Sequence, residues 1–433
     1  MRALLTASLL LLGACGGGEG GDSAYAPKSR TVRTDDLAAS PEELAERTDL
    51  ANRILALVDE AEKLRPGVSN WPKFTAPPPG KRDAGPQLAS AAWQFKLDVD
   101  HARAADETWP ALAVYGLNTF QLDNERPPTT EEINAALAAS LRLAVVAREY
   151  QLADGFSVAA FMFENEDFDY GIAMFQALGA LHNRVLLLQR CGETQAAADA
   201  LIAYIRVLTR TGTYATMLTS LATTPLLLLR ELISGELAQH AANQTVQTAL
   251  AEARATTALQ QMWLGELSFV CWKLKQGGKD ELIQLGESQA DAMEQLEASH
   301  RILQLLLDVQ RQFPLPGPDI RKKNDYSKLM ELARRTGGRE SADWVGVVAG
   351  SRVSNDNCGW CAWDLYLADV KSPLLGRKDE AAKIASGFDW VELEWGANEV
   401  EVKLSEREGP LADLTHKHMA RSFKVPLRKP TQD

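Results

Sequence analysis

The chain has 433 residues, 45% of them hydrophobic, and a formal net charge of -12. This length exceeds the size at which a single hydrophobic core usually stops growing, so we expect two domains. The excess of acidic side chains repels nucleic acid and anionic lipid headgroups, and we expect neither as a partner. Residues 320–433 hold 19 Lys plus Arg and 18 Asp plus Glu, so the acidic excess lies in the preceding part of the chain.

The N-terminus has the layout of a secretory signal. Met1-Arg2 supplies one positive charge, and the apolar run from Ala3 to Leu12 is too short to span a bilayer as a permanent helix. We therefore expect residues 1–14 to be a signal peptide. The glycine-rich stretch Gly16–Gly21 predicts a flexible tether over residues 15–39.

The end of the apolar run carries a family resemblance. Leu12-Gly13-Ala14-Cys15 resembles the lipobox of bacterial lipoproteins. The resemblance implies cleavage before Cys15, lipidation of its sulfur and residence in the bacterial cell envelope, with the membrane as a partner through the lipid. Gly16 resembles the sorting pattern for outer-membrane transfer, which implies the periplasmic face of the outer membrane. The alternative is an ordinary signal peptide with an incidental cysteine, and the glycine tether argues against it.

Helical signals dominate residues 40–318. Ser40 with Glu43, and Thr129 with Glu132, each form a predicted capping box at a helix start. Antiparallel helix pairs joined by tight turns predict an irregular helical bundle or solenoid. Further helical segments are expected at residues 169–190, 194–210, 213–240, 244–275 and 279–312.

One predicted helix pair has a resemblance of its own. Its turn is Cys191-Gly192-Glu193, because glycine favours a left-handed helix end. The hairpin from Ile172 to Leu237 resembles helical hairpins of uncharacterised envelope proteins of planctomycete-type bacteria, and it is similar to a tetratricopeptide helix pair. The resemblance depends on alanine and leucine spacing, implies a scaffold and brings no catalytic residues with it.

Two segments between helices need an interpretation. In the irregular arm of residues 67–86, we expect Trp71 and Phe74 to pin the chain to the body, with a binding loop as the alternative. The segment Thr211–Leu229 lacks charged residues, but its threonines and Pro225 predict a core helix and not a membrane span.

Alternation by twos predicts a small antiparallel β domain over residues 340–433. After a short helix at residues 326–335 that ends at Gly337-Gly338, we expect strands at residues 344–348 and 362–370. Residues 389–395 and 399–404 flank a short turn and predict a β-hairpin. Charged residues on one side and apolar residues on the other predict a sheet with one face in solvent.

Four cysteines remain beyond Cys15, an even number for a compartment in which disulfides persist. We expect Cys358 and Cys361 to pair and tighten a β loop. Cys191 and Cys271 are expected to pair across helices or to stay as buried apolar side chains. The Cys358-Gly359-Trp360-Cys361 spacing also suits a thiol–disulfide oxidoreductase, in which one thiolate attacks and the second resolves. A polar loop before the motif and a strand after it favour the structural bond.

We expect no metal site and no cofactor. His416 and His418 lack nearby carboxylate or thiolate partners. The acidic stretch Glu164–Gly171 fails as the start of a calcium loop, because, counted from Asn165, the glycine falls one place late and the twelfth position is Gln176. His300 lies on an apolar helix stripe and is expected to be a core histidine. The sequence contains no nucleophile elbow, phosphate loop or nucleotide-binding glycine fingerprint.

These observations favour a lipid-anchored envelope protein that acts as a non-catalytic binding or scaffolding component, with a protein partner in a groove between helices. No catalytic residue is assigned. One alternative is a thiol–disulfide oxidoreductase that uses Cys358 and Cys361. The other is an envelope hydrolase whose carboxylate pair the linear sequence does not identify.

Overall fold

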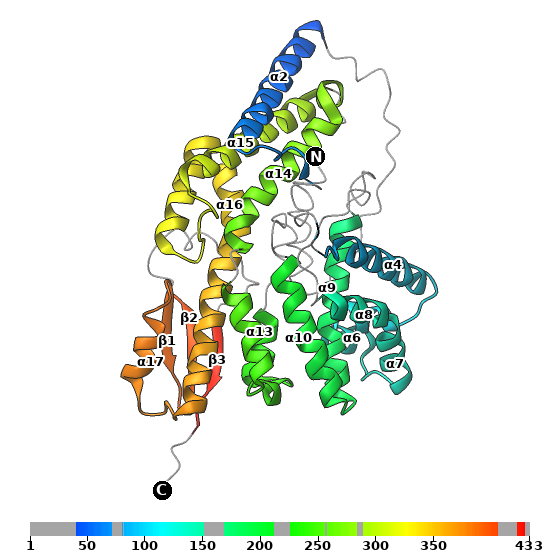
Figure 1. Ribbon diagram of the computed structural model, residues 1–433, viewed down its shortest axis with the longest axis vertical. Helices are drawn as coiled ribbons and strands as arrows, with labels where there is room; N and C mark the ends of the chain where they lie inside the picture. The colour runs from blue at the N-terminus through cyan, green and yellow to red at the C-terminus, as the bar shows by residue number, and fades with distance from the viewer. Residues whose placement is uncertain are drawn as a thin grey trace.

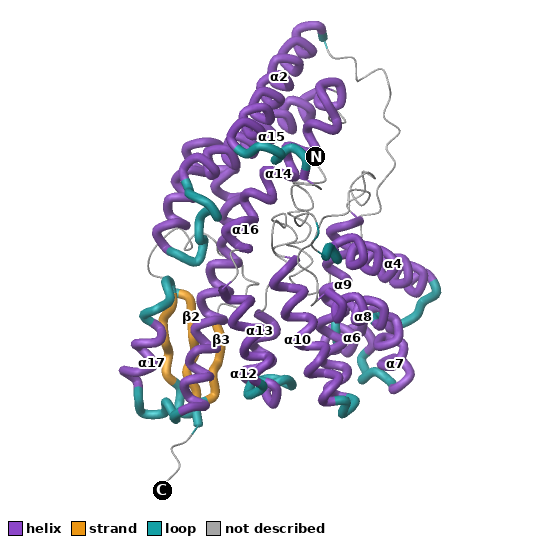
Figure 2. The backbone as a smooth tube through the Cα atoms, in the orientation of Figure 1, coloured by secondary structure: helices purple, strands orange, loops and turns teal. Residues whose placement is uncertain are grey.

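The computed structural model describes residues 40–71, 80, 82–150, 169–211, 226–255, 258–283, 289–405 and 422–428. Within them the chain is mainly α-helical, with a small antiparallel sheet near the C-terminus, as the sequence predicts (Figures 1 and 2). The predicted signal peptide, Cys15 and the tether lie outside the described residues. So do His416, His418, residues 164–168 of the acidic stretch, Phe74 and residues 212–225.

The described helices and strands run along the chain as follows. The helices are α2 (Pro41–Leu64), α4 (Gly85–Ala104), α5 (Trp109–Tyr115), α6 (Leu117–Asn124), α7 (Thr130–Ala139), α8 (Leu141–Tyr150), α9 (Asp169–Arg190), α10 (Thr194–Thr211), α12 (Leu226–Ser234), the short 3-10 helix η3 (Ala238–His240), α13 (Gln244–Ala255), α14 (Ala258–Ile283), α15 (Gln289–Gln312), α16 (Lys323–Lys371) and α17 (Lys378–Ala385). The strands are β1 (Val391–Trp395), β2 (Glu399–Leu404) and β3 (Ser422–Pro426).

Both predicted capping boxes are present. Ser40 Oγ accepts the Glu43 N–H at 3.2 Å, and a Glu43 carboxylate oxygen accepts the Ser40 N–H at 2.8 Å. Thr129 and Glu132 make the same reciprocal pair at 3.2 and 2.7 Å. A cap of this kind stabilises a helix by about 1 kcal/mol, because it satisfies N–H groups that have no partner inside the helix.

Buried apolar side chains form two clusters. The first core lies among α4 to α13, the second half of α16, α17 and the sheet. The second core lies among α2, α14, α15 and the first half of α16. Trp71 is buried in the second core, where its ring meets that of Phe269 edge-on at 5.0 Å, so the expected pinning by Trp71 is confirmed. Figure 1 shows α2 and the sheet at opposite ends of the elongated molecule.

In the first core, helix α9 contributes the side chain that satisfies the carbonyl groups at the end of α5. Asn183 Nδ2 donates to the carbonyls of Ala113 and Val114 at 3.0 Å each and so satisfies the end of α5. Gly116 follows with a φ of 86° and a ψ of -177°, a conformation that only glycine adopts without strain. The predicted hairpin turn is also confirmed, since α9 ends at Arg190, Gly192 has a φ of 79° and α10 begins at Thr194.

Two predicted strands are wrong. Residues 344–348 and 362–370 both lie in α16, which runs from Lys323 to Lys371 with a break in helical geometry at Gly337 and Gly338. The break falls where the sequence places a helix end, but the chain resumes as helix because its buried residues recur at helical spacing. Cys358, Ala362 and Leu365 are all fully buried on one side of the helix. The sheet therefore begins at Val391 and not near residue 340.

The predicted β-hairpin is confirmed, and a third strand extends it. The order is β1-β2-β3, with both pairs antiparallel. Leu393, Val402 and Phe423 stand across from one another on the face that packs against the first core. The other face carries glutamate, lysine and serine side chains, as the predicted solvent-facing side requires: Glu392, Glu394, Glu399, Glu401, Lys403, Ser422 and Lys424.

Candidate functional site

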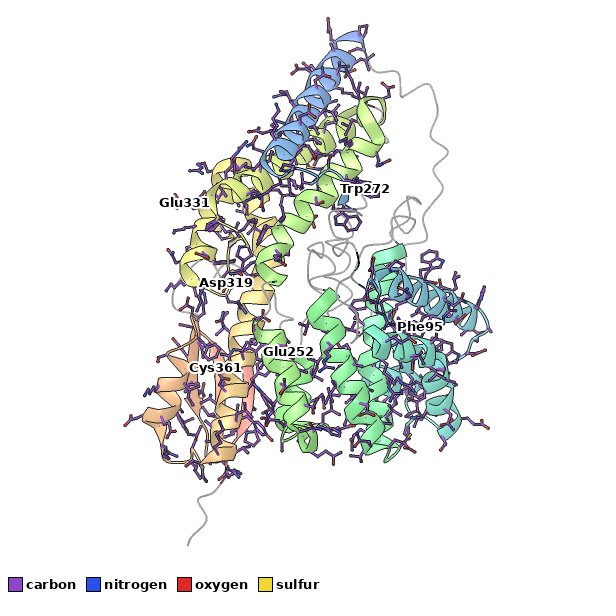
Figure 3. All side chains as sticks on the ribbon, viewed as in Figure 1. Phe95, Glu252, Trp272, Asp319, Glu331 and Cys361 are labelled. Carbon is purple, nitrogen blue, oxygen red and sulfur yellow. The ribbon has the colours of Figure 1, made fainter. Side chains whose placement is uncertain are left out.

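The Cys358-Gly359-Trp360-Cys361 motif lies in the second half of α16 and not in a β loop (Figure 3). Helical spacing of three places both sulfurs on the side that faces the first core, and both side chains are fully buried. Both thiols are free, in contrast to the predicted bond. Cys191 is free and exposed on the turn after α9, so both states predicted for it are wrong, whereas Cys271 is free and buried in α14, as one of its two predicted states requires.

Burial opposes thiolate chemistry at this motif. Desolvation raises the pKa of Cys358 to about 12. The pKa of Cys361 is raised further, first by desolvation and then by the neighbouring Cys358 and Asp364. Because the thiolate is the nucleophilic form of cysteine, these two residues are placed to pack and not to exchange disulfides. The geometry gives the oxidoreductase alternative no support.

A part-buried ion pair covers the motif. Arg254 at the end of α13 donates to both carboxylate oxygens of Asp364 on α16, at 2.7 and 2.9 Å. The Arg254 guanidinium also lies over the rings of Trp360 at 5.8 Å and Phe388 at 5.3 Å. A planar guanidinium suits this combination of a two-oxygen bond and ring stacking. Arg254 therefore holds α13 against α16 and the segment that leads to the sheet.

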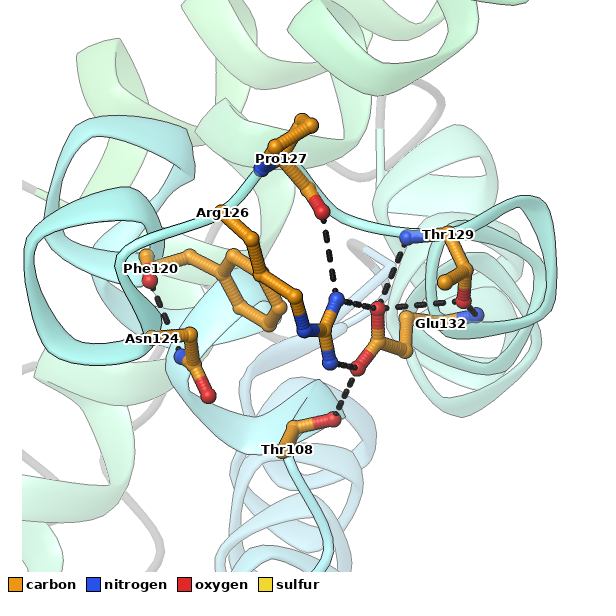
Figure 4. Close-up of polar contacts among 7 residues, drawn as sticks. All are labelled: Thr108, Phe120, Asn124, Arg126, Pro127, Thr129 and Glu132. Atoms are coloured by element: carbon orange, nitrogen blue, oxygen red, sulfur yellow. Dashed lines mark hydrogen bonds and ion pairs between the residues drawn. The ribbon is translucent and has the colours of Figure 1, made fainter.

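Among the described carboxylates, the one whose pKa is shifted most is Glu132, at the start of α7 (Figure 4). Arg126 donates to both of its oxygens at 2.8 and 2.6 Å, Thr108 Oγ1 donates at 2.6 Å, and the Thr129 N–H donates at 2.7 Å. These hydrogen bonds hold the Glu132 pKa well below its ordinary value, with that from Arg126 the largest cause. The carboxylate uses its acceptor capacity inside the protein, so it joins the α4–α5 connection to α7.

A serine between a lysine and a glutamate lies beside the second core, and sequence reasoning missed it. Ser69 Oγ donates to Glu62 at 2.7 Å and accepts from Lys275 Nζ at 3.0 Å. Glu62 also accepts the N–H groups of Gly67 and Ser69 at 2.6 and 3.0 Å, and its pKa is lowered. Ser69 is only 6% exposed and its proton is committed to Glu62. The cluster closes the loop after α2. The signal in sequence was a carboxylate on the last turn of a helix followed by a glycine turn.

Two of the described histidines, His300 and His240, are withdrawn from solvent to different extents. His300 is half-buried on α15, and its pKa is lowered by desolvation and by the nearby Arg53 and Arg301. His240 is buried and its Nε2 lies 2.9 Å from Gln189 Oε1. Within the described part of the chain, no group of three or more His, Cys, Asp or Glu residues is arranged to hold a metal ion.

The described residues thus define a helical protein with two cores and a small sheet, in which the charged clusters join one element to the next. Comparisons with protein-family models, with curated proteins and with solved structures found no match to this chain. Across the described ranges, no helix combines the length and the apolar character needed to cross a bilayer.

Proposed function

We propose that the protein is a lipid-anchored component of the bacterial cell envelope that binds a protein partner without catalysis. The observation that carries the proposal is the sequence Leu12-Gly13-Ala14-Cys15 at the end of a short apolar run. The expected product begins with lipidated Cys15, and residues 15–39 then connect the lipid to Ser40 at the start of α2. We infer an outer-membrane location facing the periplasm from Gly16.

The position of α2 supports a tethered body. Its capped start lies at one end of the long axis and the sheet lies at the other (Figure 1). A flexible tether of this length has a root-mean-square reach of about 30 Å, so the body searches a shell close to the bilayer. One acyl chain gives only marginal membrane binding, and the multiple chains of a bacterial lipoprotein anchor would hold the body stably.

The anchor can be tested with the full chain expressed in a bacterium with two membranes. We expect the protein in the membrane fraction, with an intact mass that lacks residues 1–14 and carries added acyl groups. Cys15→Ser should leave the protein unlipidated and move it to the soluble fraction. The matched control is Cys191→Ser, which removes an exposed thiol elsewhere and should leave fractionation unchanged.

Two results would overturn the anchor: an unmodified N-terminus on the mature chain, or membrane association that survives Cys15→Ser. The binding role is tested separately, by cross-linking the anchored protein in intact cells and identifying what it captures. Reproducible capture of one envelope protein is the expected result, and turnover of a glycan or peptide substrate by the purified chain would favour an enzyme instead.

A further inference from the structure

The two outer edges of the sheet are treated differently by the fold. Strand β3 is an edge strand, but the Ser422 carbonyl accepts from Arg230 at 3.3 Å and Pro426 has no N–H to offer. Both residues belong to the outward row of β3, since Val400 and Val402 are the residues of β2 that pair with it by hydrogen bonds. Proline at such a position and a covering side chain are the ordinary ways of blunting a sheet edge.

Among the residues that the structure describes, nothing covers the outer edge of strand β1 in a comparable way. The bonds from Gly396 N–H to the Glu399 carbonyl and from Ser405 N–H to the Trp390 carbonyl set the ladder, so Glu392 and Glu394 exchange bonds with β2. The N–H and C=O groups of Val391, Leu393 and Trp395 therefore face outward. No backbone hydrogen bond from the described residues reaches them.

We propose that this outer edge of β1 binds an extended peptide segment in which lysine or arginine alternates with apolar residues. Strand addition satisfies the row of unpaired backbone groups, and alternate side chains then lie on opposite faces of the sheet. The apolar side chains of the segment lie beside Leu393 and Trp395, which are half-buried. Its basic side chains lie beside Glu392 and Glu394, which are exposed.

The acidic charge on the solvent face of the sheet favours a basic segment at the edge of β1. The solvent face of the sheet holds four glutamates and two lysines, on a chain whose net charge is -12. Lys403 pairs with Glu394 and Glu401, and Lys424 pairs with Glu399 at 2.8 Å, so the acidic excess remains after internal pairing. A second copy of this chain is disfavoured, because antiparallel pairing of β1 with itself about Leu393 sets Glu392 opposite Glu394 of the other copy. Helix α17 contacts β1 through Lys378, which lies over the Trp395 ring at 5.4 Å, and among the described residues it makes no backbone hydrogen bond to the outward groups of β1.

This inference rests on the proposed binding role but not on the anchor, so the full chain carrying Cys15→Ser should bind as well as the natural chain. The probe is a synthetic eight-residue peptide of alternating lysine and valine. We expect saturable binding, with slower hydrogen exchange by about tenfold or more at the amides of Val391, Leu393 and Trp395 only in the presence of the peptide. A peptide of alternating glutamate and valine should not bind.

The matched variants separate local charge from net charge. Glu392→Lys with Glu394→Lys should weaken binding by about tenfold. Glu46→Lys with Asp59→Lys changes the net charge equally on exposed positions of α2, at the other end of the molecule, and should leave binding unchanged. N-methylation of the peptide amides that would face β1 should abolish binding, whereas methylation of the alternate amides should not.

Three outcomes would overturn the proposal. The first is that the lysine–valine peptide does not bind. The second is that the two double variants weaken peptide binding equally. The third is that the peptide does not slow hydrogen exchange at the Leu393 amide. In the first case, Glu392 and Glu394 act only as guards against edge-to-edge aggregation. Because the four charge substitutions are on exposed side chains and a far-ultraviolet circular dichroism spectrum checks folding, loss of structure is distinguishable from loss of binding.

Discussion

The buried carboxylate of Asp369 accepts the backbone N–H of Arg428 at 3.0 Å, across 59 residues of chain. Its other oxygen accepts the N–H of Leu374 at 2.8 Å. One side chain near the end of α16 therefore fixes both the turn that follows the helix and the chain leaving β3. The Arg428 guanidinium returns to the Asp369 carbonyl and carboxylate, but half of that side chain is exposed.

We expect Asp369→Ala to lower the free energy of unfolding by about 3 kcal/mol, because two N–H groups lose their buried acceptor. Arg428→Ala keeps the Arg428 N–H bond and should cost no more than about 1 kcal/mol, as for an exposed ion pair. Urea unfolding monitored by tryptophan fluorescence measures both. Equal losses for the two variants would show that the ion pair, and not the backbone bonds, carries the stabilisation.

Glycine is required at Gly116 for two independent reasons. Its backbone conformation admits only glycine without strain, and a Cβ there would lie 2.6 Å from Asn183 Oδ1. Asn183 cannot retreat without breaking its two bonds to the end of α5. Gly116→Ala should therefore destabilise the protein by about 3 kcal/mol.

The control for Gly116 is Gly192→Ala. Gly192 also has a positive φ, but an added Cβ meets no atom within 4 Å, so the cost should be about 1 kcal/mol. The difference between the two variants in chemical denaturation measures the clash with Asn183 together with the more demanding backbone conformation of Gly116. Similar costs at the two positions would contradict this assignment.

The imidazole of His182, which lies against the Tyr204 ring, should make the protein less stable in mild acid. Desolvation lowers the folded-state pKa of His182 from 6.5 to about 4. Above about pH 6.5 the imidazole is neutral in both states and its contribution is complete. Between about pH 6.5 and 4 only the unfolded state takes up the proton, so stability falls by about 3 kcal/mol as the pH falls.

The variant His182→Phe keeps a ring against Tyr204, whose centroid lies 5.6 Å away, and removes the titration. Its stability should fall less steeply than that of the natural chain over this pH range. His101→Gln, at an exposed position, should keep the natural slope. An unchanged slope in His182→Phe would remove His182 as the cause.

The cysteines should differ sharply in reactivity. With Cys15→Ser in place, we expect a maleimide to modify Cys191 rapidly in the folded protein, because that thiol is exposed. Cys271, Cys358 and Cys361 are buried with raised pKa values and should react only after unfolding. Peptide mass analysis of the labelled protein identifies the sites. Rapid labelling of Cys358 before unfolding would reopen disulfide exchange as an activity of the motif.

Local signals in the sequence predicted the local structure well. The two capping boxes, the glycine turn at Gly192 and the hairpin around residues 396–398 depend on side chains within a few positions of one another, so each can be read from its own segment. The third strand, Ser422–Pro426, was missed because five residues carry little pattern. Its signal was the alternation of Phe423 and Val425 with polar neighbours.

The predicted strands around Trp344 and Trp363, and the predicted β-loop disulfide between Cys358 and Cys361, are wrong for a physical reason. Aromatic and β-branched residues around Trp344 and Trp363 have strand propensity, and that preference is weak against burial in a core. In α16, the spacing of Cys358, Cys361 and Leu365 supplies a buried stripe that lies in the first core. The thiols therefore lie inside a helix interface and not on a loop.

The amino-acid sequence by itself determined the helix starts, the tight turns and the alternation of the hairpin, because caps, glycines and period-two patterns act over a few residues. Only the tertiary structure decided that α16 resumes as helix after the break at Gly337 and Gly338, that Asn183 satisfies the end of α5, and that, among the described residues, the edge of β3 is covered while that of β1 is open. Those features depend on contacts between residues far apart in the chain, whose free energy of packing and hydrogen bonding exceeds the local preferences of any one segment.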